Sequence, residues 1–222
     1  MSYTDNIPLK DYSRNEELAH VISHALGAVF TIIAAFIMIF TREMTPVKIT
    51  AILIMSSSML LVYTTSSVYH ALPHGNAKKI LRVLDHSFIF LAVIGSLFPF
   101  VLITLIGNTV AYIILSATSV TAVLGILFTV LGFKKYTVPS LACNFIAGAT
   151  AMVIFFLLAP AINAGEIRGA ILTPLILCGA SYALGGVLYL IGRKKKYIHA
   201  VFHIFVLIGN VFLVGSIYFY VL

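Results

Sequence analysis

Seven long runs of apolar residues follow one another along the chain, with short polar segments between them. A helix needs roughly 20 apolar residues to cross about 30 Å of hydrocarbon, and each run has about that length. The pattern therefore predicts an all-α integral membrane protein, a bundle of seven transmembrane helices. The predicted spans are Leu18 to Phe40, Val47 to Tyr69, Val83 to Ile106, Val110 to Phe133, Val138 to Ala159, Ala170 to Gly192 and His199 to Leu222.

The division between the third and fourth runs is the least marked, because only Gly107, Asn108 and Thr109 separate them. A continuous apolar stretch of about fifty residues is more than twice what one span needs, so a tight Gly-Asn turn is expected there. Six spans is the alternative count.

The composition agrees with a surface that faces lipid. Hydrophobic residues make up 61% of the chain and charged residues only 9%, whereas soluble domains carry about 25% charged side chains. The net charge of +7 would suit nucleic acid if the basic residues formed a stripe or an arm, but they fall between apolar runs. We therefore expect no nucleic-acid partner.

The basic residues also indicate the orientation of the helices. When the segments between runs are assigned alternately to two sides, eleven Lys and Arg residues fall on one side and three on the other. Basic residues in short loops mark the cytoplasm, so we predict a cytoplasmic N-terminus and an extracytoplasmic C-terminus in a multi-pass protein of the cell membrane. Residues 1–16 would form a short cytoplasmic segment, and residues 17–222 a single seven-helix domain. The eleven are Lys10, Arg14, Lys78, Lys79, Arg82, Lys134, Lys135, Arg193, Lys194, Lys195 and Lys196, and the three are Arg42, Lys48 and Arg168.

All seven histidines fall at the predicted cytoplasmic ends of the spans or in a loop beside them. His199 and His203 are four residues apart, so both imidazoles lie on one helix face and can point at one metal ion. Ser66 and His70 have the same spacing. Ionisable residues in spans are costly, and their convergence is typical of a functional site. A further stripe on the first span contains Glu17, His20 and His24.

This set of residues suits an open zinc site. Three neutral imidazoles leave a fourth tetrahedral position on Zn²⁺ for water, and the metal lowers the pKa of that water to about 7. Asp85, near the start of the third span, is a candidate to hold the water or to accept its proton as a general base. Ser66 is a candidate to hydrogen-bond the water or a substrate carbonyl.

Each residue also has a structural interpretation. Two histidines at a helix start can form an interfacial pair that faces lipid headgroups, and Asp85 can cap its helix or pair with Arg82. The stripe on the first span can cap that helix or support the metal ligands. We expect a structural role for His74, which follows a proline, and for His86, which lies about 100° around the helix from Asp85.

Four short motifs are spread from the first span to the seventh: Glu17 followed by Ser23-His24-x-x-Gly27, Ser66-x-x-x-His70, Leu84-Asp85 with Ser87, and His199-x-x-x-His203. In this combination they resemble the haemolysin III family, within the progestin and adipoQ receptor superfamily that includes the adiponectin receptors. The resemblance covers nearly the whole chain. It implies a seven-helix bundle with a cytoplasmic N-terminus.

The resemblance also implies a zinc ion held by His70, His199 and His203, with Asp85 contacting the zinc-bound water and Ser66 nearby. The chain is similar as well to a broader group of membrane hydrolases, including alkaline ceramidases, in which such a site cleaves a lipid amide. One departure is His20, where the family usually carries Asn. This leaves open whether the first span adds a pH-responsive element or another ligand.

Three functions follow from these features. The first is a zinc-dependent intramembrane hydrolase that acts on an acyl or amide lipid, in the manner of a ceramidase. The second is a non-enzymatic receptor or regulator of membrane state, in which zinc only ties the helices together. The third is a haemolysin that perturbs membranes, although the sequence has no amphipathic pore segment.

Overall fold

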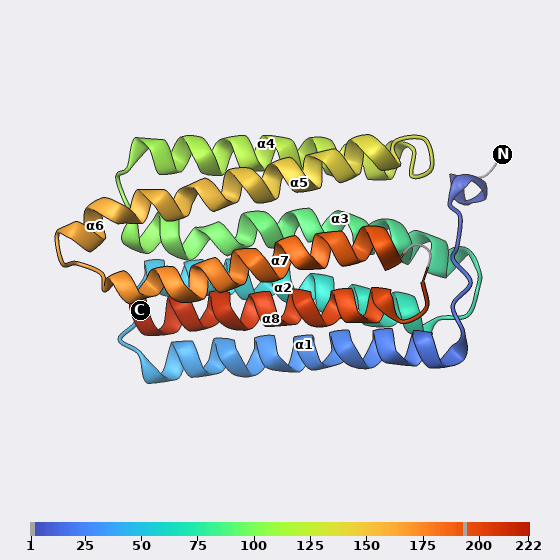
Figure 1. The fold of residues 1–222 in the computed structure, drawn as a ribbon, viewed down its shortest axis with the longest axis horizontal. Coiled ribbons are helices and arrows are strands. Elements are labelled where there is room, and N and C mark those ends of the chain that lie inside the picture. Colours follow the sequence, from blue (N-terminus) through green and yellow to red (C-terminus); the bar gives the residue numbers. More distant parts are fainter. Residues whose placement is uncertain (1–2, 193–194) are drawn as a thin grey trace.

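Seven long helices form a bundle in the computed structural model of the protein, which describes residues 3–192 and 195–222 (Figure 1). The shortest spans have 23 residues, enough at 1.5 Å per residue to cross about 30 Å of hydrocarbon. The described part of the chain contains no strand, and Arg193 and Lys194 of the charge count lie outside it. The long helices are α1 (Arg14–Thr41), α2 (Pro46–Ala71), α3 (Asn76–Pro99), α4 (Thr109–Leu131), α5 (Thr137–Val153), α7 (Leu172–Gly192) and α8 (Ile198–Tyr220).

Two of the spans are completed by irregular helical turns. A π-helical turn, Phe100–Thr104, continues α3 beyond Pro99. A 3₁₀ segment, Ile154–Leu158, and the short helix α6 (Ala159–Asn163) continue α5. Proline lacks a backbone N–H and its ring clashes with the preceding turn, so such departures from α geometry are expected beside it. Two further 3₁₀ segments are Tyr3–Asn6, before α1, and Gly169–Ile171, before α7.

Local sequence signals set several helix ends. At the start of α1, Ser13 and Glu16 form a reciprocal capping box. At the start of α2, Pro46 occupies the first turn, where its missing N–H costs nothing. Between α3 and α4, Gly107 adopts a φ of 79° and Asn108 caps α4 through its side chain. The predicted Gly-Asn turn is therefore confirmed, and the seven-span prediction with it.

The third span differs from its predicted bounds. The prediction began it at Val83, where the apolar run starts, whereas α3 begins at Asn76. The first two turns of α3 carry Lys78, Lys79 and Arg82, which an apolar-run criterion excludes. Lys78 and Arg82 have partners at the end of the bundle, described below, so the helix extends beyond its apolar part.

The long helices run roughly parallel or antiparallel to one another, with the two termini at opposite ends (Figure 1). Helices α1, α3, α5 and α8 begin at the end near the N-terminus, and α2, α4 and α7 finish there; we call it the N-terminal end. Helix α1 packs against α2 and α8, and α3 against α2 and α4. Large apolar side chains such as Ile32 and Phe36 are exposed on the outer faces, where a membrane protein meets lipid.

Candidate metal centre

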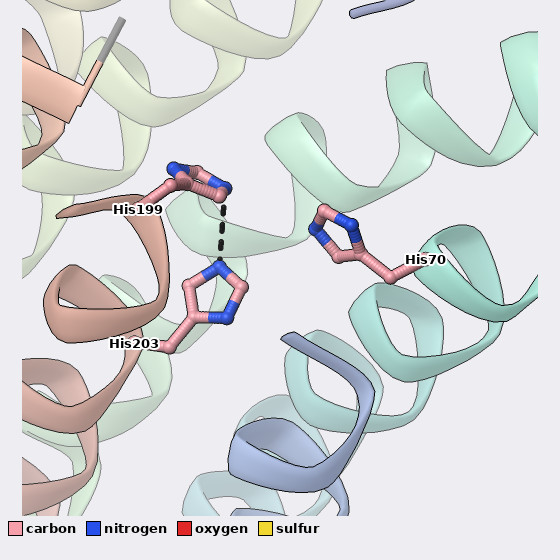
Figure 2. A group of neighbouring side chains, drawn as sticks. All are labelled: His70, His199 and His203. Atoms are coloured by element: carbon pink, nitrogen blue, oxygen red, sulfur yellow. Dashed lines mark hydrogen bonds between the residues drawn. The ribbon is translucent and has the colours of Figure 1, made fainter. Parts of the chain in front are cut away.

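Three histidines from two helices face one another at the N-terminal end of the bundle (Figure 2). His70 lies in the last turn of α2, and His199 and His203 lie on one face of the first turns of α8. One nitrogen from each ring lies within 4.8 Å of the other two. The i,i+4 spacing on α8 therefore produces the predicted shared face, and the closing of the bundle brings His70 to it.

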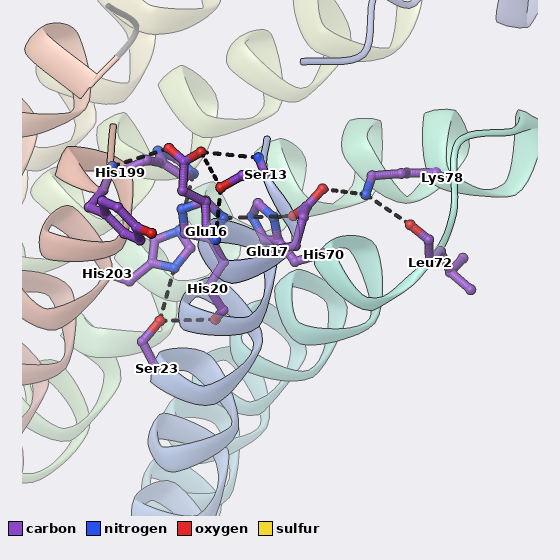
Figure 3. A network of polar contacts seen from close by, with 11 residues as sticks. Ser13, Glu16, Glu17, His20, Ser23, His70, Leu72, Lys78, His199 and His203 are labelled. Atoms are coloured by element: carbon purple, nitrogen blue, oxygen red, sulfur yellow. Dashed lines mark hydrogen bonds and ion pairs between the residues drawn. The ribbon is translucent and has the colours of Figure 1, made fainter. Parts of the chain in front are cut away.

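Glu17 of α1 holds the outer nitrogen of His70. Its Oε2 lies 2.6 Å from His70 Nδ1, and its Oε1 accepts a hydrogen bond from Lys78 Nζ at 2.6 Å (Figure 3). Lys78 also donates to the carbonyl oxygen of Leu72 at 2.8 Å and is only 1% exposed. Because a carboxylate on Nδ1 favours a proton there, the lone pair of His70 lies on Nε2, on the side of the other histidines.

Ser23 of α1 plays the corresponding part for His203. Its hydroxyl donates to the backbone carbonyl of His20 at 2.9 Å, and its oxygen lies 3.2 Å from His203 Nδ1. Since the hydroxyl proton is already used, Ser23 accepts a hydrogen bond from His203 Nδ1–H. The lone pair of His203 is thereby placed on Nε2, which is 3.1 Å from Nε2 of His199.

The donor set fits a zinc ion. His70 Nε2 is buried and has no hydrogen-bond partner in the described chain, and a buried, unsatisfied polar atom costs about 1–3 kcal/mol. The Nε2 atoms of His199 and His203 face each other at a distance that needs a shared proton or a cation between them. Three neutral imidazoles that converge in a buried site are ligands that Zn²⁺ accepts readily.

His20 and His24 complete a cluster of five imidazoles. The His20 ring centroid lies 4.3 Å from that of His70, and the His24 ring centroid lies 3.8 Å from that of His203. Both nitrogens of His20 are buried without a hydrogen-bond partner among the described residues. His20 also groups with Glu17 and His70 as metal donors, but the Lys78 ammonium on Glu17 disfavours a separate cation there.

A cavity of about 560 Å³ adjoins this cluster. Its wall includes both α8 histidines of the group, and also Asp85 and Ser66, the two predicted catalytic residues. Asp85 is the only carboxylate among the lining residues that the structure describes. Deeper in the bundle, the wall is mainly apolar and contains residues such as Phe90 and Met152.

The remaining histidines have separate surroundings. His74, in the loop after α2, has a side chain 51% exposed and lies 3.7 Å from Asp11, outside the cluster. His86 lines the cavity, and its Nδ1 donates to the carbonyl oxygen of Arg82 at 2.9 Å and lies 3.5 Å from Asp85 Oδ2. The contact between His86 and Asp85 was not predicted, because consecutive residues on a helix point about 100° apart. Their side chains nevertheless meet at their tips.

The N-terminal segment adds a contact that the sequence did not suggest. Residues 7–13, here called the strap, pass over the N-terminal end of the bundle before α1 begins (Figure 1). The Tyr12 ring stacks on His199 at a centroid distance of 5.8 Å and packs edge-on against His20 at 4.6 Å. Burial raises the pKa of the Tyr12 phenol above its ordinary value, so the phenol is neutral at pH 7. Lys10 holds the strap by donating to the carbonyl oxygen of Gly192 at 2.7 Å.

The fold and the site define a seven-span integral membrane protein with a buried group of histidines that could hold a metal ion. A model of the haemolysin-III related family matches residues 12–214. The chain is 31% identical over 209 residues to Hemolysin-3 of Bacillus cereus, covering 93% of this chain and 92% of the relative. It is 30% identical over 211 residues to the Hemolysin-3 homolog of Bacillus subtilis (strain 168), covering 94% and 96%. The chain therefore belongs to the haemolysin-III related family, as its motifs predicted.

Proposed function

We propose that the protein is a zinc-dependent hydrolase of an acyl or amide lipid, embedded in the cell membrane with its histidine cluster on the cytoplasmic side. The observation that carries this proposal is the position of the donor group, since His199 and His203 line a cavity that runs into the apolar interior of the bundle. The side on which the cluster lies rests on the excess of basic residues in the segments at this end.

The chain supplies the groups that hydrolysis needs. A zinc ion bound by three neutral imidazoles would polarise a carbonyl oxygen and lower the pKa of water to about 7. Asp85 would act as the general base that accepts a proton from water, because it is the carboxylate of the cavity wall. Ser66 is 2% exposed and lines the same cavity, so its hydroxyl would donate a hydrogen bond to the substrate carbonyl.

Helices α5 and α7 offer the lipid a path from the bilayer. Both helices line the cavity, yet their backbones stay apart where side chains bridge them. Met152 of α5 reaches over Gly179, and Phe145 reaches over Gly186. Since flexible side chains rather than packed backbones close this seam, an acyl chain would enter the cavity laterally without unfolding either helix.

The test combines metal analysis with a lipid assay on purified protein. We expect about one zinc per chain in the wild type and almost none in a His199→Ala, His203→Ala double variant, because two of three ligands are removed. Hydrolysis of an acyl or amide lipid should be lost with the metal and restored by adding zinc to metal-free wild type. His74→Ala is the matched control, since this exposed histidine lies outside the cluster.

Two results would contradict the proposal separately. If wild-type protein purified in the absence of chelators contains no zinc, the proposed metal site is wrong. If zinc-loaded protein cleaves none of the acyl and amide lipids tested, the proposed hydrolase activity is wrong.

His20 favours a second candidate, a non-enzymatic receptor or regulator with structural zinc. Both its nitrogens are buried without a hydrogen-bond partner among the described residues, next to His70. A fourth imidazole ligand would close the site, as in structural zinc centres. The signature would be stoichiometric zinc, no turnover and a large fall in thermal stability on chelation.

A further inference from the structure

The wall of the cavity, which is mainly apolar deeper in the bundle, carries basic side chains at the N-terminal end. There Arg82, His86 and Lys134 line it. Neither Arg82 nor Lys134 lies within 4 Å of a carboxylate oxygen in the part of the chain that the structure describes. Lys78, by contrast, is paired with Glu17 at 2.6 Å and does not line the cavity. Arg82 and Lys134, here called the rim of the cavity, can therefore bind an anion.

Arg82 is held in place by two contacts and keeps an N–H group without a hydrogen-bond partner among the described residues. One of its terminal nitrogens donates to the carbonyl oxygen of Pro8 in the strap, and its guanidinium lies 5.0 Å from the centre of the Phe133 ring. Its Nε is buried and has no hydrogen-bond partner among the described residues. Because a guanidinium has five N–H groups in a fixed plane, an Arg positioned in this way can still bind a phosphate or carboxylate.

We propose that the lipid in this cavity carries an anionic headgroup, a phosphate or a carboxylate, which Arg82 and Lys134 bind. This inference rests on the proposed function, because its ligand is the lipid of the same site. The apolar wall from Phe90 to Met152 takes the hydrocarbon chain. The bond between chain and headgroup then lies at the level of His199 and His203, which line the same end of the cavity.

The test compares three ligands on detergent-purified protein, both zinc-loaded and metal-free. Oleoyl lysophosphatidate and monooleoylglycerol share one chain and differ in the phosphate, and glycerol phosphate has the phosphate without the chain. Affinities come from displacement of a fluorescent lipid probe. We expect lysophosphatidate to bind at least about tenfold more tightly than monooleoylglycerol, since hydrogen bonds between a cation and an anion are roughly twice as strong as those between neutral groups. Glycerol phosphate should not displace the probe.

Three variants assign the preference to the rim. Arg82→Gln and Lys134→Gln should each reduce the preference for lysophosphatidate several-fold, with little change for monooleoylglycerol. Lys135→Gln is the matched control, because this neighbouring lysine lies over the Tyr136 ring and does not line the cavity. If Arg82→Gln also loosens the strap, Lys134→Gln still tests the inference, since Lys134 is exposed in the turn between α4 and α5.

Equal affinities for the two lipids would overturn the inference. So would a preference that persists in both rim variants, or one that Lys135→Gln reduces as much as Lys134→Gln does. Displacement by glycerol phosphate alone would identify a site for soluble anions and overturn the assignment to a lipid. Because the metal-free protein measures binding without turnover, a protein with no hydrolase activity can still pass the test, and an active hydrolase can fail it.

Discussion

Replacing Glu17 by Gln tests whether the carboxylate on His70 helps to hold the metal. The Oε2 atom of Glu17 lies 2.6 Å from His70 Nδ1, the length of a strong, charge-assisted hydrogen bond. A carboxylate in this position makes the imidazole a better ligand and fixes its orientation, and its loss typically lowers metal affinity about 10- to 100-fold. This corresponds to about 1.4–2.7 kcal/mol of binding free energy.

The substitution also leaves Lys78 without its anionic partner. Lys78 is 1% exposed, and breaking a buried ion pair by removing one partner costs about 3 kcal/mol or more. A Glu17→Gln, Lys78→Met double variant separates the two effects, because it removes both charges at once. We expect this variant to recover most of the thermal stability of metal-free wild type, while zinc affinity stays about 10- to 100-fold low.

The assay is competition with a chromogenic zinc chelator, paired with thermal unfolding of the metal-free proteins in detergent. Glu16→Gln is the control, because Glu16 lies on the same turn of α1 but accepts from Ser13 and from the backbone N–H of Tyr197 at 3.2 Å. Its loss should lower stability and leave zinc affinity within about threefold. A double variant that binds zinc as tightly as wild type would refute the reasoning.

Three further predictions concern stability, measured as the midpoint of thermal unfolding. Asn210→Leu removes two hydrogen bonds of 2.5 Å, a buried one to Tyr63 and a part-buried one to Tyr182, and should cost about 2–4 kcal/mol while zinc content is unchanged. Gly107→Val forces a branched residue to a φ of 79° and should cost about 1–2 kcal/mol. Gly95→Leu would push a side chain into α2, where α3 approaches it closely, and should cost about 1–3 kcal/mol. Unchanged midpoints would contradict each.

The fold could be predicted from the sequence because its determinants are local. Apolar runs long enough to cross a membrane identify the seven helices, and no long-range information is needed to count them. Signals within a few residues, such as Pro46 at a helix start and the Gly107-Asn108 turn, also set helix ends. The largest error in the bounds of the spans was at the start of α3, predicted at Val83 and found at Asn76, since its polar first turns depend on contacts with other helices.

The site was predictable in part. Spacing of four residues placed His199 and His203 on one face, and the structure brings His70 to them. The roles of Asp85 and Ser66 in catalysis remain predictions, although both line the cavity beside these histidines. Tyr12 could not be found from the sequence, because it belongs to a segment without periodicity whose path over the bundle is set by tertiary contacts.

Pairs of adjacent basic residues show why charge in the sequence does not reveal charge in the site. Lys78 is buried against Glu17, whereas its neighbour Lys79 is half-buried and has no ion pair with any residue that the structure describes. Lys134 lines the cavity and Lys135 does not. Lys78 and Lys79 lie on a helix, where successive residues point about 100° apart, and Lys134 and Lys135 lie in the turn between α4 and α5. In both pairs, one of two identical side chains can face a partner or ligand while the other does not. The packing of the helices decides which of two adjacent side chains faces the site. Variants of adjacent residues are therefore the sharpest probes of this site.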